Sequence, residues 1–200
     1  MKKAILYIHG KGGSYLEAEQ YKKICRDFDV FGFDYEVDFP WVVEEELQSF
    51  YNKTAEKYNE IYIIANSIGA YFTMHSLREC KIEKAYFISP IVNMEKLIMD
   101  MMMWANVTEK ELQDKQEIET SFGETLSWKY LSYVRKHPIH WEVPTEILYA
   151  GGDNLTSRET INAFVMAHNA RITIMEDGEH WFHTEKQLAF LRNWLVNIVL

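Results

Sequence analysis

The sequence has 200 residues, which is enough for one domain with a substantial core. It is 48% hydrophobic and 14% aromatic, a composition that excludes a disordered chain. Its formal net charge of −9 disfavours nucleic acid or an anionic membrane surface as a partner, because both would repel the protein. No apolar run is long enough to cross a bilayer, so we expect no membrane segment.

The N-terminal segment and the two cysteines bear on where the protein resides. The apolar stretch at residues 4–8 is shorter than the core of a secretory signal. Cys25 and Cys80 show no metal-binding or redox spacing, so we expect reduced, buried thiols. These features predict a cytoplasmic protein. They say nothing about its oligomeric state.

Strand-like segments recur along the chain at intervals that leave room for helices. Short apolar runs, rich in β-branched and aromatic residues, predict these strands. The expected strands are Ala4–His9, Val30–Val37, Ile61–Asn66, Ala85–Ser89, Thr145–Ala150 and Arg171–Glu176.

Helical patterns fill the intervals between these strands. A capping box at Ser14-x-x-Glu17 predicts a helix that extends to about Arg26. After Pro40, apolar residues recur at helical spacing as far as Tyr58, and another helix is expected over Ser67–Cys80. Capping boxes predict that the last two helices begin at Thr156-x-x-Glu159 and Thr184-x-x-Gln187. This alternation predicts an α/β fold with a six-stranded parallel sheet and helices on both faces.

Residues 91–142 interrupt the alternation with a connection much longer than the usual one. The methionine-rich segment at residues 93–107 and the aromatic segment at residues 125–137 both have helical patterns. We expect a single domain over residues 1–200 with a helical cap inserted at about 91–142. Met101, Met102 and Trp104 would form a pliable wall for an apolar substrate. Alternatively, the methionines only dock the insertion onto the sheet.

The segment IYIIANSIGAYF, residues 61–72, places a serine where an expected strand meets an expected helix. A serine on so tight a turn takes a strained backbone, which requires small residues two positions before and after it. Ala65 and Gly69 meet this requirement around Ser67. The pattern is that of a nucleophile elbow, G-x-S-x-G, with alanine in place of the first glycine. Because such a pattern also arises by chance, it needs partners elsewhere in the chain.

An acid and a histidine follow the two last expected strands. Asp153 follows the fifth strand and His180 follows the sixth. Parallel strands bring such residues to one edge of the sheet, beside Ser67. A serine needs a base to accept its proton and an acid to orient that base, and His180 and Asp153 fit these roles. Alternatively, Asp153 only caps its turn and His180 is an ordinary surface histidine. His183 is the second choice for the base.

Backbone N–H groups near Ser67 would stabilise a developing oxyanion. The amide of Ile68 is one expected donor, and the glycine-rich stretch after the first strand supplies the amide of Lys11, with Gly12 as second choice. This stretch lacks the spacing of a phosphate-binding loop. We expect His9 to hold the loop structurally.

His180 and His183 have a spacing that is also found in metal sites. Neither glutamate nor cysteine stands nearby to complete a zinc ligand set, so we expect no metal. No cofactor is expected either.

The chain resembles the α/β-hydrolase superfamily over nearly all of its length outside the insertion. The motifs that carry the resemblance are His9-Gly10, Ala65-x-Ser67-x-Gly69, Gly152-Asp153 and Gly178-x-His180. The chain order Ser67, Asp153, His180 is the one this fold uses. The resemblance implies a sheet in the order 2-1-3-4-5-6 and a cap inserted between strands 4 and 5.

These observations favour a serine hydrolase that cleaves a carboxylic ester or thioester through an acyl-enzyme. The expected substrate is a small molecule with an apolar or aromatic group of modest size. The same triad serves peptidases, amidases and acyltransferases, so these reactions stay open. An α/β-hydrolase-fold protein that only binds a ligand is the non-enzymatic alternative.

Overall fold

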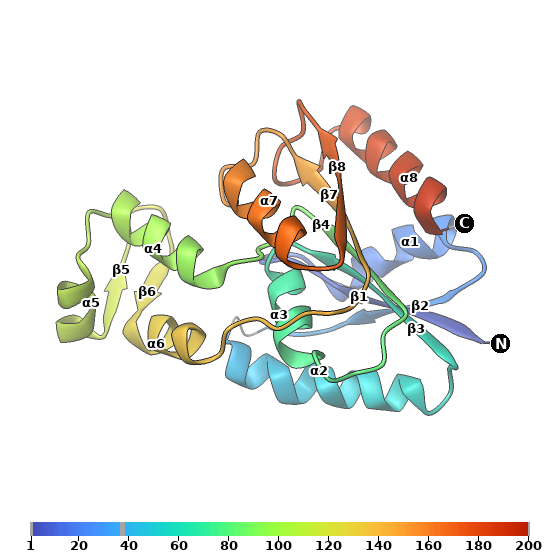
Figure 1. Ribbon diagram of the computed structural model, residues 1–200, viewed down its shortest axis with the longest axis horizontal. Helices are drawn as coiled ribbons and strands as arrows, with labels where there is room; N and C mark the ends of the chain where they lie inside the picture. Colours follow the sequence, from blue (N-terminus) through green and yellow to red (C-terminus); the bar gives the residue numbers. More distant parts are fainter. Residues whose placement is uncertain (1, 37–38, 200) are drawn as a thin grey trace. The chain divides into compact units, whose positions relative to one another are not determined.

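The computed structural model describes residues 2–36 and 39–199 of the chain. These residues form two compact units, of which the first combines Met1–Val92 with His140–Leu200. The second unit is Asn93–Ile139. Each unit has its own secondary structure, which Figure 1 shows in sequence colours.

A six-stranded sheet forms the centre of the first unit (Figure 1). Every pair of neighbouring strands is parallel, which confirms the predicted parallel sheet. The strands, in spatial order, are β2 (Asp29–Phe33), β1 (Lys3–Ile8), β3 (Glu60–Asn66), β4 (Lys84–Ile88), β7 (Thr145–Ala150) and β8 (Ala170–Met175).

The predicted strand order 2-1-3-4-5-6 is corrected to 2-1-3-4-7-8, because two further strands come before the last two in the sequence; the six predicted strands keep their expected neighbours. Two short strands in the second unit, β5 (Glu117–Glu119) and β6 (Thr125–Ser127), pair antiparallel with each other and precede the last two strands of the main sheet. Three residues are too few to show an alternating pattern, so the sequence did not reveal them. Val37, the predicted end of the second strand, lies outside the described residues.

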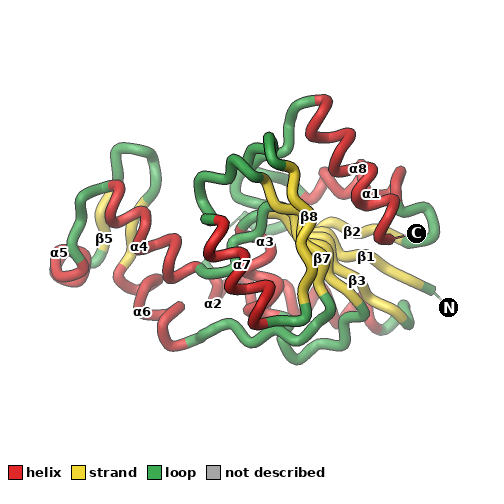
Figure 2. The backbone as a smooth tube through the Cα atoms, turned by 45° about the horizontal axis from the view of Figure 1, so that its top comes forward, coloured by secondary structure: helices red, strands yellow, loops and turns green. Residues whose placement is uncertain are grey.

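Helices lie against both faces of the main sheet. Figures 1 and 2 show α1 and α8 on one side and α2 and α3 on the other. Their bounds are α1 (Ala18–Ile24), α2 (Pro40–Ala55), α3 (Ile68–Ser76) and α8 (Glu185–Val199), while α7 (Arg158–Ala167) connects β7 to β8. Two of these helices are shorter than predicted, since α2 does not reach Tyr58 and α3 does not reach Cys80.

The core is apolar on both sides of the sheet because successive side chains of a strand point to opposite faces. Residues 4–8 of β1 are fully buried. Ile5 and Tyr7 share a core cluster with Tyr21 from α1 and Leu191 from α8. A strand that is covered on both faces reads as a continuous apolar run, as the sequence of β1 does.

Side-chain caps fix where several helices begin. The predicted capping box of Ser14 and Glu17 is present, although it opens a 3-10 turn (Tyr15–Glu17) that leads into α1. The predicted cap at Thr156 is wrong, because Ser157 accepts the hydrogen bond from the Thr160 amide and α7 begins one residue later. Thr156 instead donates its hydroxyl hydrogen to the carbonyl oxygen of Pro90.

The second unit contains α4 (Met94–Trp104), α5 (Glu109–Lys115), the β5–β6 pair and α6 (Trp128–Lys136). Arg135 of α6 donates two hydrogen bonds to the Glu109 carboxylate, at 2.7 and 2.9 Å, and one to Glu95 at 2.7 Å. These ion pairs join α4, α5 and α6, and the hydrogen bonds from Arg135 lower the pKa of Glu109. Leu112 and Leu131 are fully buried within this unit.

Both cysteines are free thiols, but the prediction that both are buried is wrong for Cys80, which is only partly buried, whereas Cys25 is buried. Burial raises the pKa of Cys25 to about 11, so this thiol is protonated at neutral pH and suits a structural role. Among the described residues, no helix combines the length and the apolar character that crossing a membrane requires.

Leu47 offers a test of the packing of α2, because its side chain is fully buried. Leu47→Ala should lower the free energy of unfolding by about 2–5 kcal/mol, since it leaves a cavity in the core. Leu16→Ala is the matched control, because Leu16 is 61% exposed and its loss should cost less than about 0.5 kcal/mol. Urea unfolding of both variants makes the comparison. Equal losses would contradict the described packing of α2.

Candidate active site

Ser67 stands at the join between β3 and α3 with a strained backbone. Its φ of 49° and ψ of −120° lie in a region that non-glycine residues rarely adopt, at a cost of about 1–3 kcal/mol. Hydrogen bonds hold this conformation, since the Ser67 amide donates to Ile88 and the Ser67 carbonyl accepts from Ala70 and Ile91. The strain therefore sits where the sequence predicts a nucleophile elbow.

Close backbone contact explains the glycine two residues after Ser67. A Cβ atom at Gly69 would lie 2.5 Å from the carbonyl oxygen of His9 and 2.6 Å from that of Ile8. No larger residue fits there unless the backbone moves. Ala65, two residues before Ser67, is fully buried.

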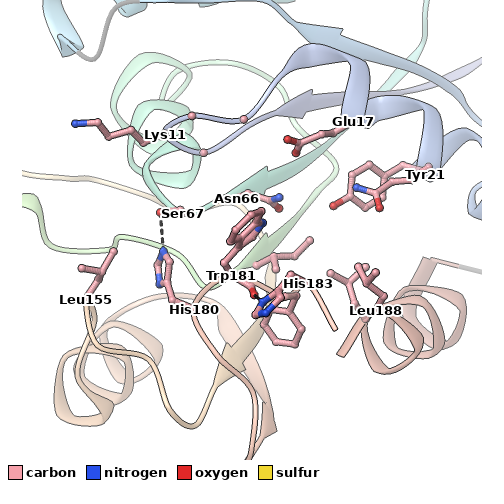
Figure 3. A pocket seen from close by; sticks show the side chains of 17 residues that line it. Lys11, Glu17, Tyr21, Asn66, Ser67, Leu155, His180, Trp181, His183 and Leu188 are labelled. Atoms are coloured by element: carbon pink, nitrogen blue, oxygen red, sulfur yellow. Dashed lines mark hydrogen bonds between the residues drawn. The ribbon is translucent and has the colours of Figure 1, made fainter. Parts of the chain in front are cut away.

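The three residues predicted to form a triad lie in one hydrogen-bonded row. Ser67 Oγ is 2.8 Å from His180 Nε2, a contact that Figure 3 marks with a dashed line. His180 Nδ1 is 2.7 Å from Asp153 Oδ2. The serine, the histidine and the acid come from the loops after β3, β8 and β7 respectively.

Asp153 is positioned by its own backbone surroundings. Its side chain is fully buried, and Oδ1 accepts hydrogen bonds from the amides of Leu155 (2.8 Å) and Thr156 (3.0 Å). Thr156 is anchored in turn by its contacts with Pro90 and with the Tyr149 hydroxyl. A buried carboxylate needs such donors, and they leave Oδ2 directed at His180.

The loops that carry Asp153 and His180 are held together by direct backbone contact. The Gly152 amide donates to the carbonyl oxygen of Gly178 at 2.9 Å. A Cβ atom at Gly151 would lie 2.3 Å from the carbonyl oxygen of Glu176, so only glycine permits this approach. These contacts hold the two loops against each other and support the short distance between the acid and the base.

The loop after β1 contains the other predicted oxyanion donors. A turn joins the Gly10 carbonyl to the Gly13 amide at 3.0 Å, and Gly12 has the positive φ (71°) that such a turn requires. His9 precedes this loop, with its ring stacked on that of Tyr35 and its carbonyl oxygen accepting from the Tyr35 hydroxyl. Figure 3 shows the Lys11 side chain pointing away from the other labelled side chains.

Whether the amides of Lys11, Gly12 and Ile68 bind an oxyanion stays a prediction. Ile68 is the first residue of α3, a position whose amide has no partner within the helix. Lys11 and Gly12 line the same cavity as Ser67.

A cavity of about 550 Å³ opens beside Ser67 and His180. One part of its wall is apolar and contains Ile88, Leu155, Phe182, Leu188 and Leu191. Another part carries polar groups that the sequence did not single out for the site, namely Glu17, Gln20, Tyr21 and Asn66. Asn66 is the signal that the sequence offered for this part of the site, because this polar residue directly follows the apolar run at residues 61–65.

His183 does not face Ser67. Its Nδ1 lies 2.6 Å from the carbonyl oxygen of Trp181, and its amide donates to the Gln187 side chain. The structure therefore places His180, and not the second-choice histidine, against the serine. Among residues 2–36 and 39–199, no group of three metal-ligating side chains comes together.

The three residues predicted for a substrate wall all belong to the second unit. Met102 is buried, whereas Trp104 is 47% exposed and has its ring centroid 6.2 Å from that of Phe122. A role of Met101, Met102 and Trp104 in substrate binding stays a prediction.

Solved structures resemble this chain closely in their backbone. The alpha/beta hydrolase domain-containing protein 10 from mouse superposes with a TM-score of 0.80 at 14% identity, over 98% of this chain and 89% of its own. Est1E from Butyrivibrio proteoclasticus superposes with a TM-score of 0.77 at 15% identity, over 98% of this chain and 86% of its own. The chain has the α/β-hydrolase fold.

This fold carries more than one chemistry among the similar structures. A monoacylglycerol lipase from Paleococcus ferrophilus superposes with a TM-score of 0.65 at 15% identity, over 97% of this chain and 94% of its own. An epoxide hydrolase from Bacillus megaterium superposes with the same TM-score at 14% identity, over 98% of this chain and 93% of its own. Neither a family model nor a curated protein matches the sequence. The fold alone therefore does not determine the reaction, which depends on the residues of the site.

Gly69→Ala tests the close contact at the elbow. The added methyl group would meet the His9 carbonyl oxygen, so the variant should lose about 1–3 kcal/mol of stability, as overpacked cores do. Gly123→Ala is the control, because nothing lies within 4 Å of its Cβ position and only its positive φ opposes alanine, at roughly 1 kcal/mol. An unchanged urea midpoint for Gly69→Ala would contradict the contact.

Proposed function

We propose that this protein is a serine hydrolase that cleaves a carboxylic ester or thioester through an acyl-enzyme. The observation that carries the proposal is the hydrogen-bonded row from Ser67 through His180 to the buried Asp153, at 2.8 and 2.7 Å. An ordinary surface histidine, or an aspartate that only caps its turn, is not expected to lie in one hydrogen-bonded row with a strained serine. The substrate is a small molecule with an apolar or aromatic group of modest size, which the apolar part of the cavity favours.

In the proposed mechanism, Ser67 Oγ attacks the carbonyl carbon while His180 Nε2 accepts its proton. Asp153 Oδ2 accepts from His180 Nδ1, which keeps the imidazole oriented and stabilises its charged form. The amides of Ile68 and Lys11, with Gly12 as second choice, donate to the oxyanion of the tetrahedral intermediate. His180 then returns the proton to the leaving group, and a water molecule cleaves the acyl-enzyme by the same steps.

Ser67 itself argues against one alternative reaction. Epoxide cleavage in this fold normally uses an aspartate at the elbow, where the nucleophile attacks carbon directly. A serine with a histidine at hydrogen-bonding distance suits acyl transfer instead. Amide hydrolysis and acyl transfer to an alcohol use the same residues, and a substrate panel separates them from ester hydrolysis.

Reaction with a fluorophosphonate tests the proposal without knowledge of the substrate. An activated Ser67 should displace fluoride and form one phosphonyl ester, which intact mass spectrometry detects. Ser67→Ala should form no adduct and should unfold at nearly the same urea concentration as the wild type. A folded wild type that forms no adduct, or an adduct that persists in Ser67→Ala, would overturn the proposal.

The two histidines of the same loop provide a matched pair for the base. His180→Ala should slow fluorophosphonate labelling by at least about 10³-fold, because nothing then accepts the serine proton. His183→Ala should label nearly as fast as the wild type, since His183 bonds to Trp181 and Gln187 and not to Ser67. The reverse result would transfer the role of base to His183.

A further inference from the structure

Glu17 is a partly buried acid that lines the cavity beside the proposed nucleophile. Its Oε1 accepts from the Ser14 amide at 3.1 Å, and its Oε2 accepts from the Tyr7 hydroxyl. The Tyr7 oxygen in turn accepts from Asn66 Nδ2 at 3.1 Å. Two hydrogen bonds thus link Glu17 to the residue before Ser67, so this carboxylate is held in a fixed position and does not move freely like a surface acid.

No cation in the described part of the chain neutralises this carboxylate. Within residues 2–36 and 39–199, Glu17 forms no ion pair with lysine, arginine or histidine. Lys11 also lines the cavity, but Figure 3 shows its side chain pointing away from the other labelled side chains. Of the two histidines in the wall, His180 is the proposed base, and His183 has Glu179 as an acidic neighbour at 3.4 Å.

The capping box does not require the charge of Glu17. Glutamine completes the same motif, so a neutral residue could begin the helical turn equally well. The charge acts on the polar part of the cavity instead. Burial raises the pKa of Tyr7 and of Tyr21, and the negative charge of Glu17 adds to the rise at both. A fixed negative charge at the wall of a cavity attracts a positively charged ligand.

Trp181 supplies an aromatic surface at the same cavity. It directly follows His180 in the sequence, and it lines the cavity while remaining 77% exposed. Figure 3 shows Glu17 and Trp181 on opposite sides of Asn66. Tryptophan has the ring whose face attracts cations most strongly. A cation between the two side chains would therefore meet a carboxylate on one side and an aromatic ring on the other.

We propose that the cavity selects a substrate with an ammonium group, held between the Glu17 carboxylate and the Trp181 ring. This inference rests on the proposed ester hydrolysis and names its substrate class: a carboxylic ester or thioester whose apolar part ends in an ammonium group away from the reacting carbonyl. The apolar part of the wall contacts the linker. The net charge of −9 acts in the same direction, because an acidic protein attracts cations. A carboxylate in the same place would be repelled by Glu17.

Esters that differ only in charge test the proposal. A trimethylammonium group and a tert-butyl group have nearly the same shape, so replacing the nitrogen by carbon removes the charge alone. One pair is choline butanoate and its carbon isostere, with the charge on the alcohol side. The other pair is the p-nitrophenyl ester of γ-(trimethylammonio)butanoic acid and its carbon isostere, with the charge on the acyl side. A pH indicator records acid release, and in the pair whose charged group reaches Glu17, kcat/KM should favour the ammonium ester by about tenfold or more.

Glu17→Gln removes the charge and keeps the capping box. It should reduce the preference to about twofold or less, because the ammonium ester loses the opposite charge. Glu19→Gln is the matched control, since Glu19 pairs with Lys22 and does not line the cavity. This control changes the net charge equally and should keep the preference. A preference that Glu17→Gln retains, or that Glu19→Gln also loses, would overturn the proposal. Urea unfolding checks that both variants fold.

Trp181→Leu tests the aromatic side of the site in a position where the fold tolerates change, because the side chain is 77% exposed. It should lower the ratio of the two kcat/KM values about threefold, since leucine offers no ring to the cation. Tyr15→Leu is the control, because Tyr15 is also exposed but does not line the cavity, and it should leave the ratio unchanged. A ratio that Trp181→Leu leaves unchanged would contradict the proposed site.

Fluorophosphonate labelling gives a readout that does not depend on turnover. Choline should slow the labelling of Ser67 at an about tenfold lower concentration than its neutral carbon isostere, and Glu17→Gln should remove this difference. A labelled protein that shows the charge preference in neither hydrolysis nor protection would overturn the ammonium selectivity and leave the serine chemistry standing. A folded wild type that is not labelled would overturn the proposed function, and the selectivity with it.

Discussion

The close approach of α3 to the end of β1 is the constraint on which the candidate site depends. At Gly69 the helix lies so near the His9 carbonyl oxygen that a methyl group has no space. The chain turns abruptly just before this contact, where Ser67 takes a positive φ. The same carbonyl oxygen is held by Tyr35, so the loop after β1 and the serine share one fixed point. A single backbone contact thus sets both the nucleophile and the loop beside it.

The fold tolerates the polar groups of the site because the core beneath them is large and apolar. The sheet beneath them is covered on both faces, and residues such as Ile5, Ile64 and Leu148 are fully buried. Against that background, the strained backbone of Ser67 costs about 1–3 kcal/mol, and hydrogen bonds offset the cost of burying Asp153. Rigid strands also hold the loops at their ends more accurately than long loops could hold each other. Stability and site geometry therefore come from the same packing.

The fold was largely predictable because the four central strands, β1, β3, β4 and β7, are mostly buried and appear as apolar runs between helical patterns. The positions of Ser67, Asp153 and His180 after three of the predicted strands followed from the same reading. The hairpin of β5 and β6 was not predictable, because three-residue strands leave no periodic signal. The polar part of the cavity was missed for another reason: Glu17 reads as the second residue of a capping box, a role that it also fills. Only its position in the wall of the cavity shows that it belongs to the site as well.

The row from Ser67 to Asp153 also has a kinetic meaning for folding. Its members follow three different strands, and the serine and histidine are 113 residues apart in the sequence. Such non-local contacts form late, since long loops must close before the strands can pair. Helical signals could recover while β8 is still undocked, and the serine would then have no base. The onset of serine reactivity during refolding would therefore time the docking of β8, an event that circular dichroism alone would not resolve.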